Sequence, residues 1–165
     1  MKKLANLLIL TIALLALGGC GFQPRGSVPQ LDKLPGPVYI SGIDRYSPLH
    51  RELSEQLQQA GVQLTHDGNS ATSLLRIRDH RSGRRLFSVD SSNRAAEFEL
   101  EESLKFSVRH VSRGELIEDQ TVRVLRVLFR PDDQVLARER EEQQLRDDMR
   151  RDLVGRIIRR IKAQG

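Results

Sequence analysis

The chain has 165 residues, with 27 lysines and arginines against 22 aspartates and glutamates, and a single cysteine. A chain of this length suits one domain with a modest core, and only one stretch is apolar enough to enter a bilayer, which excludes a polytopic membrane protein. One cysteine excludes an internal disulfide framework and a cysteine-based zinc cluster. With five phenylalanines, two tyrosines and no tryptophan, the composition argues against a base-stacking surface for nucleic acid.

The N-terminus has the organisation of a secretory signal. Two lysines precede an apolar run from Leu4 to Leu17, and a run of about 14 residues is too short for a stable transmembrane helix. The run ends in Leu-Gly-Gly-Cys at positions 17–20, which resembles a bacterial lipobox. An ordinary signal peptide with an incidental cysteine is the alternative. We predict cleavage of residues 1–19 and a membrane anchor on Cys20, consisting of an N-acyl and an S-diacylglycerol group.

The predicted mature chain begins with a tether. Residues 20–37 are rich in glycine and proline, which predicts an extended linker between the lipid and a single domain over residues 38–165. Gly21 favours the outer membrane, because aspartate at that position retains such lipoproteins in the inner membrane. Cleavage removes two lysines, so the positive excess falls from +5 to +3.

The first part of the predicted domain alternates short elements. We expect a strand over residues 38–43 and a helix over residues 48–60, with Ser47 as its N-cap, proline at its first position and Gly61 just past its end. Another strand can start at residues 62–65. A strand-like segment follows over residues 73–89, in which Ser82-Gly83 supplies a turn signal that can break it, and residues 90–93 form a second turn signal.

The next segment is the clearest. Apolar and charged residues alternate with period two, which predicts a long half-buried strand: the apolar set is Phe98, Leu100, Leu104, Phe106 and Val108, and the polar set is Glu97, Glu99, Glu101, Lys105, Ser107 and Arg109. After a turn at 112–114 the chain returns as a strand over 116–129. Its alternation slips, because Val122 and Val124 take one face and Leu125, Val127 and Phe129 the other. Either a bulge lies near Val124 or both faces are covered at that end.

A helix of about 30 residues is predicted from Asp132-Asp133 to about Ile161. Leu145, Met149, Leu153, Ile157 and Ile161 lie four residues apart and form its apolar stripe. Residues 137–144 contain no large apolar side chain, so this start of the helix stands in solvent or meets a partner. The order of elements predicts an α+β sandwich, with two helices packed on one face of a small, mostly antiparallel sheet.

No motif in the chain indicates catalysis or metal binding. None of the four histidines has the spacing of a zinc-protease helix, and neither a nucleophile elbow nor a phosphate-binding glycine loop is present. We therefore predict no catalytic residue, no metal and no enzyme activity.

The distribution of arginine is more informative. Residues 76–94 contain six arginines and two aspartates, and turns at Gly83 and Asn93 would bring Arg84, Arg85 and Arg94 together. Solvated strand edges explain such charges equally well on composition alone. Arginine forks bind phosphate in two-point contacts, and the abundant polyanion of an outer membrane is lipopolysaccharide.

Taken together, several short motifs resemble the LptE family of lipopolysaccharide-assembly lipoproteins. They are Cys20-Gly21-Phe22 with Arg25-Gly26; Ser47-Pro48-Leu49 with Arg51, Leu57 and Gly61-Val62; Ala96-Glu97-Phe98; Phe129, Pro131, Gln134 and Ala137; and Met149 with Arg159-Arg160-Ile161. The resemblance covers nearly the whole mature chain and implies two helices on a four-stranded sheet. It also implies a plug inside the outer-membrane β-barrel LptD.

The resemblance further implies contact with lipopolysaccharide. We predict that Arg94 and Arg138 bind it, followed by Arg84 and Arg85, and that Phe129, Arg130 and Pro131 face the barrel. Apart from the lipid on Cys20 no cofactor is expected, and no nucleic acid. Two alternatives remain open: a free-standing, periplasm-facing lipoprotein that binds another anionic envelope component, and a small envelope hydrolase, for which no motif is present.

Overall fold

The computed structural model describes Leu31, residues 34–129 and residues 135–164, with the side chains of the last helix described from residue 139. The elements are β1 (Val38–Ser41), α2 (Pro48–Gln59), the 3₁₀ turn η1 (Gly68–Ser70), β2 (Ser73–Val89), β3 (Ala95–His110), β4 (Gly114–Phe129) and α3 (Val135–Gln164). The predicted signal peptide, Cys20 and most of the predicted tether lie outside the described residues. No helix in the described part is long and apolar enough to cross a membrane.

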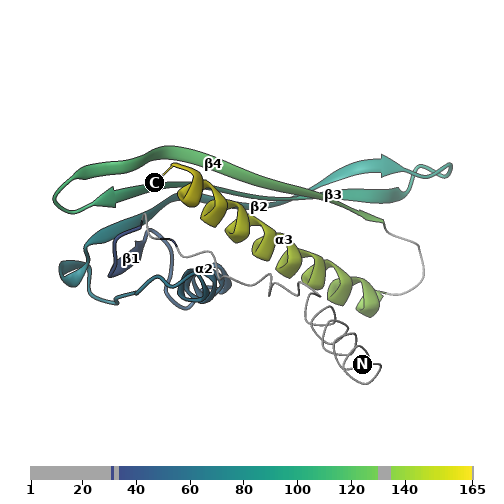
Figure 1. The fold of residues 1–165 in the computed structure, drawn as a ribbon. Helices are drawn as coiled ribbons and strands as arrows, with labels where there is room; N and C mark the ends of the chain where they lie inside the picture. Colours follow the sequence, from purple (N-terminus) through teal and green to yellow (C-terminus); the bar gives the residue numbers. More distant parts are fainter. Residues whose placement is uncertain (1–30, 32–33, 130–134, 165) are drawn as a thin grey trace, which may run out of the picture.

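The strands form one sheet in the order β1-β2-β3-β4. β1 pairs with β2 in parallel, and the other two pairings are antiparallel. Both helices lie on the same face of this sheet, and α3 crosses it diagonally (Figure 1). The predicted α+β sandwich of two helices on a four-stranded, mostly antiparallel sheet is confirmed.

The ends of α2 follow from its sequence. The Ser47 hydroxyl accepts a hydrogen bond from the backbone N–H of His50, and Pro48 occupies the first turn. Gly61 adopts the left-handed conformation, with φ of 79°, which glycine reaches without a steric penalty. The predicted helix over 48–60 therefore differs from the observed one by a single residue. Leu49, Leu53 and Leu57 are all buried.

The core lies between the sheet and the stripe of α3. Met149, Leu153, Ile157 and Ile161 are at most 1% exposed, as is Phe106 of β3. Burying one such side chain stabilises a fold by about 1.5–3 kcal/mol, so this layer dominates the packing energy. The N-terminal part of α3 does not contribute to this core. Its first described side chains, residues 139–141, are exposed, which agrees with the absence of large apolar residues there.

The structure corrects the predicted break in β2. Gly83 is not in a turn: it pairs with Glu101 in the middle of an unbroken strand. The alternation instead shifts at a bulge between Ile77 and Asp79, after which His80 and Ser82 take the helix-facing side. The turn at residues 90–93 is confirmed, and there Asn93 has a φ of 59°. Of the possible strand at 62–65, only an isolated bridge between Leu64 and Val38 forms.

The predicted alternation of β3 is confirmed, and β4 is its hairpin partner. The register between them is continuous from Glu97–Phe129 to Phe106–Gln120, so the first of the two alternatives, a bulge near Val124, is wrong. The irregularities lie farther along, between Phe106 and Arg109. Val122 and Val124 are buried under the helices, whereas Phe129 is 62% exposed on the opposite face. The apolar residues of β4 therefore serve two faces of the sheet, and the outer one is open to solvent.

Candidate functional site

The structure separates the two adjacent arginines that the sequence grouped together. Consecutive residues of a strand point to opposite faces. Arg84 lies on the helix side, where its Nη1 is 3.0 Å from Glu142 Oε2 and its guanidinium lies 4.9 Å from the centre of the Phe98 ring. Arg85 lies on the outer face, with its Nε 2.6 Å from Glu99 Oε1. No turn at Gly83 exists to present them with Arg94.

Arg94 belongs to the turn at the far end of the β2–β3 hairpin. Its Nε is 3.0 Å from Asp90 Oδ2, and its backbone N–H donates to Asp90 Oδ1 at 2.9 Å. The backbone hydrogen bond from Arg94 is the main cause that lowers the pKa of the Asp90 carboxyl. The Arg94 side chain is 61% exposed. It is thus an accessible cation on an ordered turn.

The remaining predicted site residues cannot be placed in the same way. Arg138 belongs to α3, but its side chain lies outside the described residues, as do Arg130, Pro131 and Cys20. Their predicted roles stay predictions.

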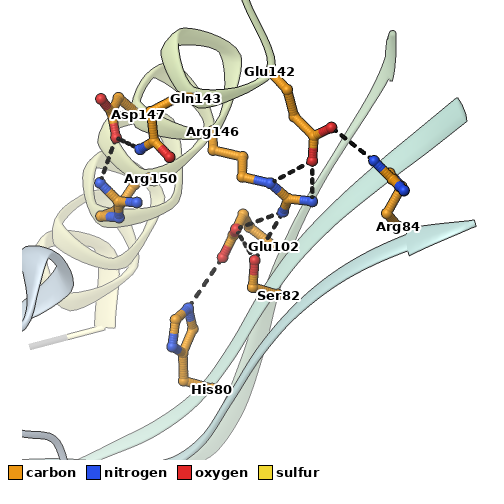
Figure 2. Close-up of polar contacts among 9 residues, drawn as sticks. All are labelled: His80, Ser82, Arg84, Glu102, Glu142, Gln143, Arg146, Asp147 and Arg150. Atoms are coloured by element: carbon orange, nitrogen blue, oxygen red, sulfur yellow. Dashed lines mark hydrogen bonds and ion pairs between the residues drawn. The ribbon is translucent and has the colours of Figure 1, made fainter. Parts of the chain in front are cut away.

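Sequence reasoning missed a buried polar network between the sheet and α3 (Figure 2). Glu102 of β3 is only 2% exposed. Its carboxylate lies 3.0 Å from His80 Nε2, accepts from the Ser82 hydroxyl at 2.5 Å and lies 3.4 Å from Arg146 Nη1. Arg146 also donates to Glu142 at 2.8 Å. Through Glu142 the network continues to Arg84, so it ties β2, β3 and α3 together.

The electrostatics of Glu102 follow from these partners. Burial alone raises the pKa of a carboxyl group, because it disfavours the charged form. The hydrogen bonds from His80 and Ser82, together with the charges of His80 and Arg146, outweigh burial and hold the pKa of Glu102 below its ordinary value of 4.5. The group is therefore a charged structural carboxylate at neutral pH.

One signal in the sequence could have found this residue. Glu102 has the same parity as Leu100 and Leu104, which places it on the buried face of β3. A buried carboxylate requires partners. The identity of those partners was not predictable, because Arg146 is distant in sequence and His80 reaches this face only through the bulge after Ile77.

The outer face of the sheet is the most distinctive exposed surface. On β4, Leu125, Val127 and Phe129 are 43%, 48% and 62% exposed and form what we call the apolar row. Directly opposite them on β3 lie Glu101, Glu99 and Glu97, which we call the acidic row. Neither helix covers this face (Figure 1). A nonpolar row beside a charged row suits contact with another macromolecule.

The chemistry available on these surfaces is that of recognition. The polar groups form ion pairs and hydrogen bonds with one another, and among the described residues no group of three or more histidine, cysteine or acidic side chains could hold a metal ion. The guanidinium groups of arginine can bind an anion, and the apolar row can bind a protein surface.

Comparisons with known proteins agree with this architecture. The chain is 29% identical to the LPS-assembly lipoprotein LptE of Photorhabdus laumondii, covering 93% of this chain and 83% of that protein. It is 30% identical to that of Yersinia pestis strain Pestoides F, covering 93% and 73%. Among solved structures, a lipoprotein B from Nitrosomonas europaea is similar with a TM-score of 0.69 at 28% identity, covering 87% of this chain and 91% of that one.

A second solved structure, the rare lipoprotein B from Shewanella oneidensis, shares the fold with a TM-score of 0.66 at 23% identity, over 76% of this chain and 93% of that one. The family model described as LptE, lipopolysaccharide-assembly, matches residues 36–161, which is most of the chain. The chain therefore belongs to the LptE family of lipopolysaccharide-assembly lipoproteins.

Proposed function

We propose that this protein is a non-enzymatic lipoprotein of the outer membrane, anchored through Cys20, which plugs and assists the assembly of an LptD-type β-barrel and binds lipopolysaccharide. The membership of the family supports a role in lipopolysaccharide assembly. The location, the barrel partner and the contact with lipopolysaccharide are the parts proposed here.

The observation that carries the barrel partner is the apolar row on β4. Single exposed apolar side chains are ordinary on protein surfaces, but a contiguous row is a frequent sign of a contact surface. Leu125, Val127 and Phe129 follow one another on the same face of an edge strand, which also favours association with another chain. Because barrel interiors are polar, the neighbouring acidic row fits the same partner. Arg130 and Pro131 follow Phe129 directly in the chain.

Co-purification tests this partner. A tagged LptD-type barrel extracted in detergent is expected to retain the wild-type lipoprotein, and Val127→Asp/Phe129→Asp is expected to reduce the retained amount at least about tenfold, because charges would replace buried apolar contacts. Tyr46→Asp/Val111→Asp is the matched control, since Tyr46 and Val111 are 83% and 54% exposed outside the apolar row. Equal retention of all three proteins would contradict the proposed interface. A wild-type monomer that never retains a barrel would favour the free-standing lipoprotein.

The contact with lipopolysaccharide is proposed for Arg94 and Arg138 first. Arg94 is exposed on the hairpin turn, and its guanidinium group can donate two parallel hydrogen bonds to a phosphate group. Arg84 and Arg85 are placed second, because they lie along β2 on opposite faces of the sheet, Arg84 beside Glu142 and Arg85 beside Glu99, and not in the hairpin turn. Charge reversal by Arg94→Asp/Arg138→Asp is expected to weaken lipopolysaccharide binding, whereas Arg81→Asp/Arg113→Asp is expected to leave it unchanged. An unchanged affinity for the first variant would refute the assignment.

A further inference from the structure

A second concentration of arginine lies far from the hairpin turn. A groove of about 620 Å³ separates β4 from the last turns of α3, and it is lined by Thr121, Val122, Arg123, Arg156, Arg159, Arg160 and Ala163. Its volume is within the range of about 300–1,000 Å³ that is typical of small-ligand sites. Figure 1 shows the end of α3 at the opposite end of the sheet from the turn that contains Arg94. We call this hollow the arginine groove.

The arginine groove has an excess of positive charge. Four arginines line it, and no acidic residue does within the part of the chain that the structure describes. Two carboxylates reach these arginines from outside: Glu101 pairs with Arg123 at 2.8 Å, and Asp152 pairs with Arg156 at 3.0 Å and with Arg159 at 3.8 Å. Asp152 is also shared with Arg126, at 3.2 Å. Because Arg123 and Glu101 pair on the outer face of the sheet, the helix side is left with Arg126, Arg156 and Arg159 sharing the Asp152 carboxylate among the described residues. This leaves the groove able to accept further negative charge.

Arg160 makes a weaker contact than its neighbours. Its Nη1 donates to the amide oxygen of Gln120 at 3.1 Å. An amide oxygen is a neutral acceptor, so this hydrogen bond does not neutralise the charge of the guanidinium. A phosphate oxygen in the groove would accept a stronger, charge-assisted hydrogen bond from the Arg160 guanidinium.

The spacing of these arginines carries a cost for the helix. Residues at i, i+3 and i+4 are neighbours on a helix surface, and like charges there are destabilising. Arg156, Arg159 and Arg160 have this spacing on α3. The helix dipole favours cations in the last turn, where the basic residue is Lys162, so it does not account for these three arginines. A bound anion would offset the repulsion among all three.

Arg156 is also held in place. Asp152 accepts hydrogen bonds from its Nε at 3.2 Å and its Nη2 at 3.0 Å, and its Nη1 donates to the backbone carbonyl of Arg123 at 3.1 Å. The hydrogen bond that Arg156 donates to Asp152 raises the pKa of Arg156. An ordered guanidinium loses less conformational entropy when it binds a ligand, so the site is partly preorganised.

We infer that the arginine groove is a binding site for a phosphate ester. Arginine forks match phosphate oxygens, and a compact dianion suits cations within one helical turn better than an extended acidic peptide does. The buried Val122 on the lining gives carbon atoms next to the phosphate an apolar contact. The inference rests on the proposed function only for the source of the phosphate, which is a glycolipid headgroup or a free phosphate compound.

The experiment uses the full lipidated chain in neutral detergent micelles. Inorganic phosphate and purified lipopolysaccharide are titrated separately, while nuclear magnetic resonance follows the arginine side-chain N–H groups. Phosphate is expected to shift the signals of Arg156, Arg159 and Arg160, and Arg159→Gln/Arg160→Gln is expected to weaken phosphate binding about tenfold or more. Arg81→Gln/Arg151→Gln removes the same charge outside the arginine groove and is expected to bind phosphate like the wild type. Circular dichroism checks that each variant is folded.

The two titrations separate the possible results. Weaker binding of both probes by Arg159→Gln/Arg160→Gln supports a site for a glycolipid headgroup, and weaker binding of phosphate alone supports a site for a free phosphate compound. Phosphate binding by a wild type that never binds lipopolysaccharide would refute the proposed function and leave this inference standing. Equal phosphate affinities of variant, control and wild type would overturn the inference, and so would signals that respond to tetraglutamate but not to phosphate.

Discussion

The two ends of the same sheet contrast sharply. At the end that covers α2 and the last turns of α3, the helix-facing side chains are fully buried, including Leu75 of β2 and Phe106 of β3. At the other end, where the β2–β3 hairpin projects past the helices (Figure 1), Leu86, Phe87 and Val89 are 53%, 55% and 48% exposed. The strands are continuous, so the difference arises from what covers them.

This contrast separates stability from recognition. Burial of apolar surface provides most of the folding free energy, and it is concentrated at the covered end. The projecting end retains its backbone hydrogen bonds but few buried contacts, which are the properties of regions that adapt to partners. We therefore expect equivalent substitutions at the two ends to differ in their effect on the free energy of unfolding.

The largest difference is expected for large-to-small substitutions. Leu153 is completely buried under the sheet, whereas Phe87 is 55% exposed on the hairpin. Leu153→Ala removes buried apolar surface and leaves a cavity, so it should cost about 3–5 kcal/mol. Phe87→Ala should cost about 0.5 kcal/mol or less. Urea unfolding followed by circular dichroism measures both, and equal losses would show that the hairpin has a core of its own.

Two glycines give the second contrast. Gly42 directly follows β1 and has a φ of 89°, and a Cβ there would overlap the carbonyl oxygen of Ile77 at the bulge of β2. Gly83 lies in the hairpin, where the nearest atom to an added Cβ is 3.9 Å away. Gly42→Ala should therefore cost about 3 kcal/mol through strain and overlap. Gly83→Ala should be neutral or slightly stabilising, because alanine restricts the unfolded chain. If Gly42→Ala left the free energy of unfolding unchanged, the bulge of β2 would have to move to accommodate the added methyl group.

The polar network gives a contrast between neighbouring carboxylates. Glu102 is buried, whereas the Glu101 side chain is 36% exposed and pairs with Arg123 on the outer face. Glu102→Gln should cost about 1–2 kcal/mol at pH 7, because Arg146 and His80 lose a charged acceptor. Glu101→Gln should change stability much less, since exposed ion pairs contribute little.

The same pair predicts a dependence on pH. Because the folded protein lowers the pKa of Glu102, the charged carboxylate stabilises the fold above its ordinary pKa of 4.5, and this contribution is lost as pH falls through the lowered value. Unfolding measured between pH 7 and pH 3 should therefore show a shallower decline for Glu102→Gln than for Glu101→Gln or the wild type. Identical slopes would mean that Glu102 does not titrate differently on folding.

The sequence predicted the parts of this molecule that depend on local pattern. The period-two alternation of residues 98–108 and the four-residue spacing from Met149 to Ile161 identified the main layers correctly, because such patterns survive packing. The bulge after Ile77 was not predictable, since it depends on how β2 meets β3 rather than on a local motif. Ser82-Gly83 has the composition of a turn, but it lies within an unbroken strand, and strand alternation then places Arg84 and Arg85 on opposite faces.

The smallest contrast concerns these adjacent arginines, Arg84 and Arg85. Arg84 bridges Glu142 of α3 and the Phe98 ring, so it is one of the contacts that hold the hairpin to the helix. Arg84→Gln should cost about 0.5–1 kcal/mol, through the loss of a cation–π contact and an ion pair. The Arg85 side chain is 72% exposed on the outer face, where solvent screens its pair with Glu99.

Arg85→Gln should accordingly leave the urea midpoint unchanged, and high salt should not alter that result. If the two substitutions have equal effects, the face on which an arginine lies has no influence on how firmly the hairpin is held. A loss confined to Arg84→Gln, and smaller when Arg84→Gln is made in a Glu142→Gln background, would assign that part of the effect to the contact with α3. The projecting end would then depend on this polar contact, while the covered end depends on its apolar layer.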